Sequence, residues 1–421
     1  MDQGNTAFIL ICAALVLLMT PGLAFFYGGL VKAKSVISMM MMSFGAMGLI
    51  GVLWVLYGYA IAFPAAEGTV APWAVDPGAF GLTNLLETPE GAAYPPLAFA
   101  AFQATFAIIT VALVSGAIAD RAKFGAWMVF AAIWATVVYF PVASWVFNFG
   151  LADDGSFAYG GWLTKGLQDV FGVGTIDFAG GTAVHINAGA AALALALVLG
   201  KRVGFAKGVS VPHNPPFVLL GAGLLWFGWF GFNAGSELAA DGTAALAFVN
   251  TIAAPAAALL AWLLVEKLKD GKPTSVGAAS GAVAGLVAIT PACGSLSPFW
   301  AIVLGLVAGA VCALAIDLKF KLGFDDSLDV VGIHLIGGLI GTLYLGIFAN
   351  GTGLIYSGSG TQLLVQAIAA FSVLIYSFVL AFVIGYVIEK TMGFRVKNED
   401  EIAGIDTVVH GEEGYVLVDS K

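Results

Sequence analysis

The chain has 421 residues, of which 60% are hydrophobic and only 10% are charged. Because a soluble domain has about a quarter charged residues, this composition excludes an ordinary soluble globular protein and predicts an all-α polytopic membrane protein. The net charge of −9 mildly favours cations as ligands. The three cysteines have no paired spacing, so the sequence predicts no disulfide and no metal site. No cofactor and no nucleic-acid partner are expected either.

Apolar runs recur along the whole chain and are long enough to cross the roughly 30 Å of a bilayer's hydrocarbon layer as helices. In chain order they cover residues 6–31, 36–62, 96–119, 124–147, 179–200, 216–236, 243–267, 275–292, 298–317, 330–349 and 361–390. The first run has no positively charged flank, so we expect it to be a membrane span and not a signal peptide. The sequence thus predicts eleven transmembrane helices in the cell (plasma or inner) membrane.

Lysine and arginine are distributed unevenly between the loops. If all eleven runs cross the membrane, all but one of the 17 basic residues fall on the same side, and the exception is Lys165. Because cytoplasmic loops retain positive charge, that side is predicted to be the cytoplasm. The N-terminus is therefore expected outside the cell and the C-terminus inside.

The eleven runs divide into two blocks of five and a final single run. An odd-numbered block that is repeated once has the opposite orientation the second time, so we expect an inverted repeat. The halves are predicted at about residues 1–200 and 216–349 of a transmembrane domain that covers residues 1–391. The run at 361–390 has no counterpart and is expected to pack at the periphery.

The last residues, 392–421, change abruptly to a polar composition. A solvated, disordered end is one expectation for such a tail. The spacing of Ile402, Ile405, Val408 and Tyr415 indicates the other, in which the tail docks onto the inner loops.

Two histidines lie inside expected spans, His185 in the fifth and His334 in the tenth. An ionisable group in a membrane is costly and persists mainly where it lines a polar path or has a partner. Each histidine follows an aspartate, Asp177 or Asp329, and each lies in the last span of its half. The rise of a helix places the two imidazoles at depths that allow contact. The pair predicts a conduction route, and a simple hydrogen bond between helices is the alternative.

Other candidate residues have two interpretations from the sequence. Asp177 precedes Gly180 and fits a helix N-cap, while its charge at the outer mouth would also attract a cation. Trp162 fits an interfacial aromatic belt. Beside Phe106 and Ser236 it would instead form a cation site from aromatic faces and a hydroxyl acceptor. Nothing local to Trp162 decides between these two.

These residues lie in motifs that resemble the ammonium transporter (Amt/Mep/Rh) family, within its Amt branch. The matching motifs follow the family's order: Phe102-Gln-Ala-Thr-Phe106, Asp177-Phe-Ala-Gly-Gly-Thr-Ala-Val-His185-Ile-Asn, Trp229-Phe-Gly-Phe-Asn-Ala-Gly-Ser236, Asp329-Val-Val-Gly-Ile-His334 and His410-Gly-Glu-Glu-Gly-Tyr415. The resemblance runs from the first span to the tail, and no motif position departs from the family's pattern.

The resemblance implies a homotrimer with one pore per subunit and, as a partner at the cytoplasmic face, a PII-type nitrogen-regulatory protein. The residue roles that it implies are external ammonium recruitment for Trp162, Phe106 and Ser236, a stacked gate for Phe106 and Phe232, a pore lined by His185 and His334, and a structural and transport role for Asp177.

The expected function is therefore ammonium transport. Ammonium is recruited, loses its proton and crosses as ammonia, while the proton is relayed separately and makes transport electrogenic. Two alternatives stay open: an ammonium sensor that signals through its tail, and an Rh-like channel for neutral gases. The lack of an appended output domain counts against the sensor. An enzyme is not expected, since no nucleophile, metal cluster or nucleotide loop is visible in the sequence.

Overall fold

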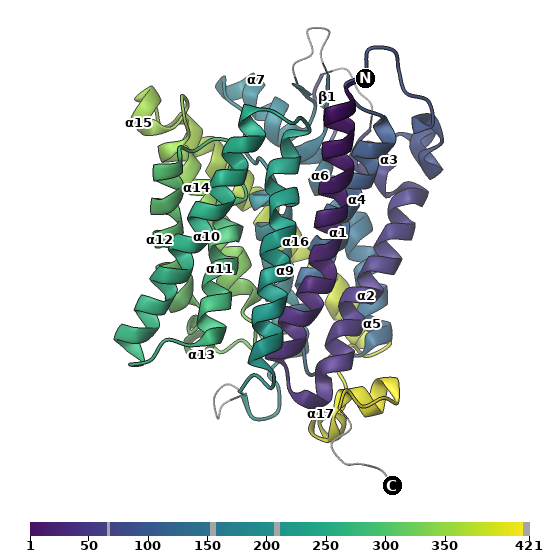
Figure 1. Cartoon of the computed structure of the whole chain (residues 1–421). Coiled ribbons are helices and arrows are strands. Elements are labelled where there is room, and N and C mark those ends of the chain that lie inside the picture. The colour runs from purple at the N-terminus through teal and green to yellow at the C-terminus, as the bar shows by residue number, and fades with distance from the viewer. Residues whose placement is uncertain (65–67, 152–156, 206–210, 416–421) are drawn as a thin grey trace.

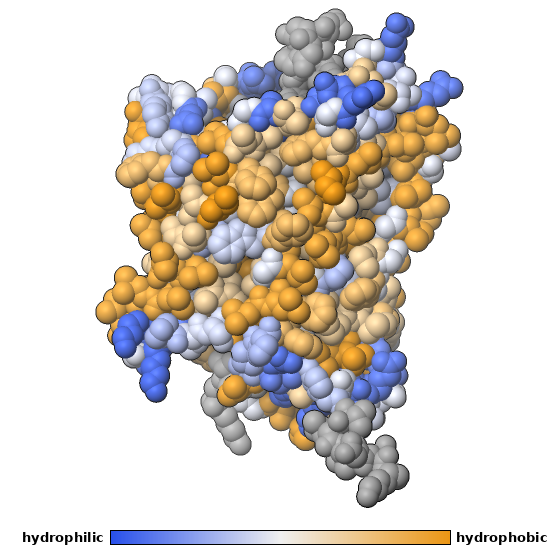
Figure 2. All heavy atoms as spheres, in the orientation of Figure 1, coloured by the Kyte–Doolittle hydropathy of each residue, from blue (hydrophilic) through white to orange (hydrophobic). Residues whose placement is uncertain are grey.

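The computed structural model describes residues 1–64, 68–151, 157–205 and 211–415. Its long helices lie side by side; α1 (Gln3–Leu30) starts at one end of the bundle and α17 (Asn398–Ala403) lies at the other (Figure 1). Figure 2 shows a broad hydrophobic band between two more polar ends. This is the surface of a multi-pass membrane protein. We call the two ends the N-terminal face and the C-terminal face.

The first half contains five of the long apolar helical segments and one small hairpin. Its main elements after α1 are α2 (Val36–Leu53), α3 (Tyr59–Ala62), α4 (Pro96–Val114), α5 (Phe124–Trp134), α6 (Phe140–Phe147), β1 (Phe149–Leu151), β2 (Phe157–Tyr159), α7 (Leu167–Phe171) and α8 (Asn187–Leu199). The strands β1 and β2 pair antiparallel. Apart from this hairpin, the predicted all-α fold is confirmed.

The described residues of the second half form helices joined by loops, with no β-strand. Its main elements are α9 (Pro215–Ala234), α10 (Gly242–Lys269), α11 (Ser275–Ile289), α12 (Pro298–Ala315), α13 (Leu318–Leu322), α14 (Ile336–Phe348), α15 (Leu354–Ser357), α16 (Thr361–Thr391) and α17. A π-helical turn stands directly before α8 (η7, Gly181–Ile186) and another directly before α14 (η10, Val331–Leu335). Such turns are frequent at functional sites.

Polar side chains set the starts of several of these helices. Asp2, Asn214, Asp241, Thr274 and Ser297 each accept a hydrogen bond from a backbone N–H in the first turn of the helix that follows. These amides have no partner within the helix, so a side-chain acceptor stabilises the helix start. The chain therefore changes from loop to helix at defined residues.

Ten helical segments in the described residues are long and apolar enough to cross a membrane. The segment expected at 275–292 differs, because α11 has only 15 residues and spans about 22 Å. Most of its residues are buried among neighbouring helices. Irregular backbone is tolerated at membrane depth where protein covers it. The chain can thus leave the helical conformation at Thr290 without exposing polar groups to lipid.

Glycine allows the closest helix approach in the second half. Gly305 and Gly309 of α12 face the backbone carbonyls of Ala254 and Ala258 in α10, and a Cβ atom at either glycine would overlap the facing carbonyl oxygen. Small residues at such contacts let two helix backbones pack directly. The close contact of α10 with α12 follows from this spacing.

Helix α16 lies at the periphery, as predicted, yet it also supports the interior. It is the least buried of the long spans, with 33% of its apolar window buried. On its inner face, Gln366 accepts a hydrogen bond from the Ile176 amide at 2.8 Å and donates one to the Ile176 carbonyl at 2.8 Å. Gln362 donates to the Gly174 carbonyl at 3.1 Å. Helix α16 therefore holds the segment that leads into Asp177.

The described part of the tail docks onto the loops of the C-terminal face. The Asp406 carboxylate accepts hydrogen bonds from the backbone amides of Ile37 at 3.0 Å and Ser38 at 2.7 Å, at the start of α2. Glu401 accepts one from the Val203 amide at 2.7 Å. The docking expectation is confirmed for these residues, and positions 416–421 lie outside the described residues.

We expect Asp406→Ala to loosen the docked tail. The substitution removes the cap of α2, a loss that typically costs about 1 kcal/mol, so trypsin should cleave after Lys397 about five times faster than in the wild type. Gel analysis of a digestion time course in detergent measures the rate. Glu412→Ala, at an exposed acidic residue of the same tail, is the matched control. Equal cleavage rates in all three proteins would contradict the capping role.

Candidate functional site

The two histidines contact each other in the interior of the bundle. His334 Nδ1 lies 3.2 Å from His185 Nδ1, and the ring centroids are 5.2 Å apart. His185 comes from η7 and His334 from η10, and their exposed fractions are 1% and 3%. Because a neutral imidazole has one donor and one acceptor nitrogen, the contact requires one Nδ1 to donate and the other to accept. The contact allowed by the sequence is confirmed.

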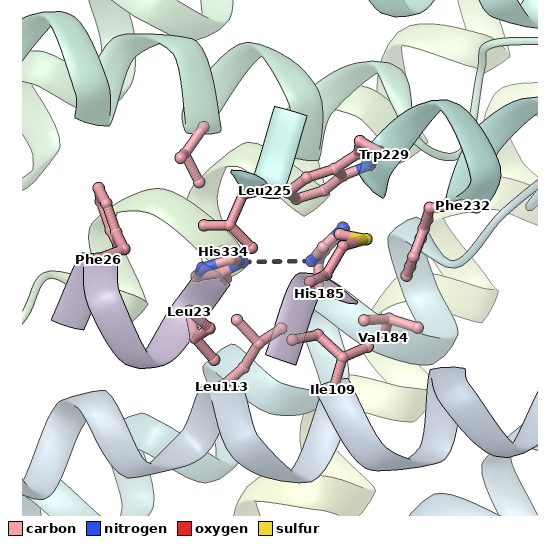
Figure 3. A pocket seen from close by; sticks show the side chains of 12 residues that line it. Leu23, Phe26, Ile109, Leu113, Val184, His185, Leu225, Trp229, Phe232 and His334 are labelled. Atoms are coloured by element: carbon pink, nitrogen blue, oxygen red, sulfur yellow. Dashed lines mark hydrogen bonds between the residues drawn. The ribbon is translucent and has the colours of Figure 1, made fainter. Parts of the chain in front are cut away.

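A narrow cavity of about 10 Å³ lies at this pair, and most of its lining is apolar. Figure 3 shows the histidines side by side, with Phe232 beyond His185 and Phe26 beyond His334. Trp229 stacks on His185 at 5.5 Å between centroids. A cavity of this size has room for the centre of about one water-sized molecule. The site therefore fits one small molecule at a time between hydrophobic walls.

Asp177 caps the π-helical turn that carries His185. Its Oδ1 accepts hydrogen bonds from the Gly180 and Gly181 amides, and its Oδ2 accepts from the Thr182 and Ala183 amides. Burial raises the pKa of the Asp177 carboxyl to about 6, and the four amide hydrogen bonds oppose that rise. Hydrogen bonds from four donors favour the ionised carboxylate. It satisfies four donors that a helix start leaves free.

The corresponding cap in the second half is Asp326, which the sequence reasoning missed. Its carboxylate accepts hydrogen bonds from the Val330 and Val331 amides at 3.1 and 2.7 Å. Asp326 precedes His334 by eight residues, the same spacing that separates Asp177 from His185. This equal spacing is the feature of the sequence that could have identified Asp326 as the cap. Asp329, for which the sequence indicated a structural or electrostatic role, forms an ion pair.

Asp329 stands where η10 begins and points to a lysine. It forms an ion pair with Lys319 at 2.5 Å, and Lys319 also donates to the Asp326 carbonyl at 3.0 Å. The backbone of Asp329 is left-handed, with a φ of 62°, a conformation that costs most residues about 1 kcal/mol. Asp329 and Lys319 thus hold the turn that places the Asp326 cap.

The two phenylalanines expected as a gate stack directly on one another. Their ring centroids are 4.2 Å apart with an interplanar angle of 28°, and each residue is 1% exposed. Phe232 also lies 6.1 Å from the His185 ring. Ser236, one helical turn beyond Phe232, donates its hydroxyl to the Phe232 carbonyl at 2.8 Å. The structure thus brings Phe106, Phe232, Ser236 and His185 together.

Trp162 contacts a second tryptophan. Its ring packs on Trp145 at 5.5 Å between centroids, with an interplanar angle of 66°. It begins the π-helical turn η6 (Trp162–Gly166), which also carries Thr164 to the wall of the cavity described next. Trp162 is partly buried and packs against the hydrophobic core.

A larger cavity of about 510 Å³ opens at the N-terminal face. We call it the vestibule. Its wall includes Phe147, Asp177, Ser236 and Glu237, and the ring centroid of Phe147 lies 6.4 Å from that of Phe106, one of the two stacked phenylalanines. The vestibule, the stacked rings and the histidine pair therefore follow one another from the N-terminal face inward.

A model of the Ammonium Transporter Family matches residues 7–415. The chain belongs to the ammonium transporter family. An ammonium transporter of Mycobacterium bovis is 53% identical, with 98% of this chain and 90% of the relative covered. An ammonium transporter of Bacillus subtilis is 42% identical, and 99% of each chain is covered.

Solved structures of this family have the same fold. A sensor Amt protein superposes with a TM-score of 0.86 at 28% identity, over 96% of this chain and 98% of the other. Mep2 from Candida albicans superposes with a TM-score of 0.83 at 32% identity, over 95% of this chain and 88% of the other. In the present chain, the sequence alone assigned no role to Trp229. Its stacking on His185 depends on three-dimensional packing that the spacing in the sequence does not reveal.

Proposed function

We propose that the protein transports ammonium, and that it does so by removing a proton from the cation before the nitrogen crosses the pore. Ammonium enters the vestibule, passes as ammonia between Phe106 and Phe232, and is held by His185 and His334. The proton follows separately through the histidine pair, so that transport is electrogenic. The observation that supports this proposal best is the contact between two buried imidazoles inside a narrow, apolar cavity.

The apolar cavity favours ammonia over any cation. Moving an ion out of water into a low-dielectric interior costs several kcal/mol even after the surroundings relax. Potassium has a size and charge similar to those of ammonium but cannot shed its charge. Ammonium can, because it has a proton to lose. The stacked rings and the cavity walls would therefore admit the neutral species and reject potassium.

The histidine pair offers ammonia a hydrogen-bonding partner at this point. His185 Nε2 is buried and has no hydrogen-bond partner among the described residues. A buried polar atom without a partner costs about 1–3 kcal/mol. Ammonia in the cavity would satisfy such an atom, whichever tautomer His185 adopts, since ammonia both donates and accepts. The shared hydrogen bond between the two Nδ1 atoms gives the proton a path from one ring to the other.

Ammonium-evoked current in proteoliposomes on a solid-supported membrane tests this proposal. We expect a transient current whose sign corresponds to positive charge moving in the same direction as ammonium. Protein-free liposomes should give no such current. An Rh-like channel for neutral gases would instead acidify or alkalinise the lumen without current. The fold similarity to a sensor Amt protein, together with the docked tail, favours a sensor as the second candidate. A sensor would show ammonium-dependent release of the tail without flux.

We also propose the assembly and partners that the family resemblance implies. Residues 1–391 would form the transmembrane domain, with its two halves at about 1–200 and 216–349, in a homotrimer embedded in the bilayer. The N-terminal face would lie outside the cell and the C-terminal face inside. Residues 392–421 would form a regulatory tail, next to which a PII-type protein would bind. Light scattering of the detergent-solubilised protein tests the trimer.

A further inference from the structure

We propose that Thr290 is a positioning residue of the histidine pair. Its hydroxyl holds the indole of Trp229 against the His185 ring, and this support determines how fast ammonium is transported. The inference rests on the proposed transport of ammonium. It adds two residues to the pore expected from the sequence, which consisted of His185 and His334.

Trp229 forms part of the wall of the cavity at the histidine pair. Its ring stacks on His185 with an interplanar angle of 26°, and the residue is 2% exposed. Phe232 follows three residues later on α9, and both rings lie against His185 because side chains three apart share one face of a helix. In the view of Figure 3, Trp229 lies above His185, and Val184 and Ile109 lie below it. Movement of the indole would therefore open space beside the His185 ring.

The orientation of this indole depends on one hydrogen bond. An indole has a single polar group, an N–H that only donates. In Trp229 the N–H donates to the Thr290 hydroxyl at 2.8 Å, and that hydroxyl donates its own proton to the Leu286 carbonyl at 2.8 Å. Thr290 is completely buried, and a buried donor that loses its acceptor is costly. The Thr290 oxygen therefore fixes the direction in which the indole points.

The short helix α11 sets the place of Thr290, which is the first residue after it. The backbone amide of Thr290 donates to the Leu286 carbonyl at 3.2 Å, so both the amide and the hydroxyl are tied to the last turn of α11. The next residue, Pro291, accepts a hydrogen bond from the Phe178 amide at 3.1 Å. Phe178 follows Asp177 directly in the chain. The end of α11 is thus held in place relative to the Asp177 cap and the turn that carries the histidine.

A simpler role for Thr290 is to stabilise the end of α11. A threonine hydroxyl commonly bonds a carbonyl one helical turn back, and such a bond concerns the helix alone. The oxygen of Thr290 also accepts from a ring that lines the cavity. The two roles make different predictions, because the positioning role requires the indole of Trp229 and the helix-ending role does not.

The test is the maximal ammonium-evoked current of Thr290→Val in proteoliposomes. Valine keeps the branched shape but removes the acceptor, so the indole turns away from His185. A displacement of about 1 Å at a reacting group can lower a rate about 100-fold, and we expect a maximal current about 10-fold below wild type. Thr290→Ser retains the hydroxyl and should stay within about two-fold of wild type. Thr20→Val is the matched control, because Thr20 is also buried but its hydroxyl has no hydrogen-bond partner among the described residues. It should leave the current unchanged.

Trp229→Phe separates the two roles of Thr290. Phenylalanine has no N–H, so in this background the Thr290 hydroxyl has no indole to hold. Adding Thr290→Val to Trp229→Phe should therefore change the current less than about two-fold. An equal loss from Thr290→Val in both backgrounds overturns the proposal and leaves the helix-ending role.

The nuclear magnetic resonance signal of the indole N–H reports the hydrogen bond independently of transport. In detergent-solubilised protein that contains isotope-labelled tryptophan, Trp229→Phe identifies the Trp229 signal by its loss. This signal should shift in Thr290→Val and keep its wild-type position in Thr290→Ser and Thr20→Val. A signal that does not move in Thr290→Val overturns the proposal.

The outcomes separate this inference from the transport proposal. No current from the wild type overturns ammonium transport itself, whatever the indole signal shows. A wild-type current that Thr290→Val leaves unchanged overturns the role of Thr290 alone. If Trp229→Phe by itself removes the current, the serine variant decides, and a loss in Thr290→Ser equal to that in Thr290→Val overturns the proposal. Should Thr290→Val fail to fold, Thr290→Ala takes its place with the same expected loss.

Discussion

Replacing both buried histidines, His185→Phe with His334→Phe, should reduce the ammonium-evoked current at least about 100-fold. Phenylalanine keeps an aromatic ring of similar size but offers no hydrogen bond. Ammonia in the cavity would lose its polar partners, at about 1–3 kcal/mol for each buried hydrogen bond. The proton would also lose the route between the two Nδ1 atoms, which lie 3.2 Å apart in the wild type. Currents in proteoliposomes measure the loss.

The single variants show whether the two rings act as a unit. Each of His185→Phe and His334→Phe should lose most of the current, because the remaining imidazole has no partner with which to share a proton. The double variant should then be little worse than either single variant. Thermal unfolding in detergent controls for misfolding, since an apolar replacement inside an apolar cavity should keep the fold. Unchanged current and selectivity in the double variant would contradict the histidine mechanism.

Asp177→Ala should abolish transport and destabilise the protein more than any other single aspartate substitution at the site. Four backbone amides of η7 would lose their acceptor inside the protein. Each buried donor left without a partner costs about 1–3 kcal/mol, so we expect a loss of about 4 kcal/mol or more in the free energy of unfolding. The start of η7 would rearrange, and His185 would move with it. Thermal unfolding and current measurements test the two effects.

The aspartates of the second half provide a graded comparison. Asp326→Ala removes the acceptor of two amides, so its cost should be smaller than that of Asp177→Ala and still disable transport. Asp329→Ala removes the ion pair with Lys319. The Asp329 side chain is 28% exposed, so this substitution should lower the free energy of unfolding least. A larger loss of stability for Asp329→Ala than for Asp326→Ala would show that the ionic contact, and not the cap, determines the start of η10.

Most of the architecture could be predicted from the positions of apolar residues in the sequence. Long apolar runs must form helices in a bilayer, so their positions predict the spans. The interior contact between His185 and His334 was also within reach, because helix rise converts residue number into depth. The length of α11 could not be predicted, since an apolar composition does not reveal that neighbouring helices cover its end. The helix ends at Ile289, and the neighbouring protein keeps the irregular backbone that follows away from lipid.

The details of the site depended on hydrogen bonds between residues that are distant in the sequence. The sequence pairs His334 with the nearer Asp329, whereas the cap of η10 is Asp326, whose carboxylate reaches the first free amides. The packing of Trp162 on Trp145 arises from loops that fold over the N-terminal face. No periodic pattern encodes such loops, so their contacts come only from the structure.

Selectivity between ammonium and potassium distinguishes transport of ammonia from passage of an intact cation. Wild-type proteoliposomes on a solid-supported membrane would receive equal concentration jumps of ammonium and of potassium at constant ionic strength. If the nitrogen must lose its proton to pass, ammonium should give a current at least about 100-fold larger than potassium, because potassium would have to cross the apolar cavity as an ion. A potassium current of comparable size would contradict deprotonation and identify a simple cation pore.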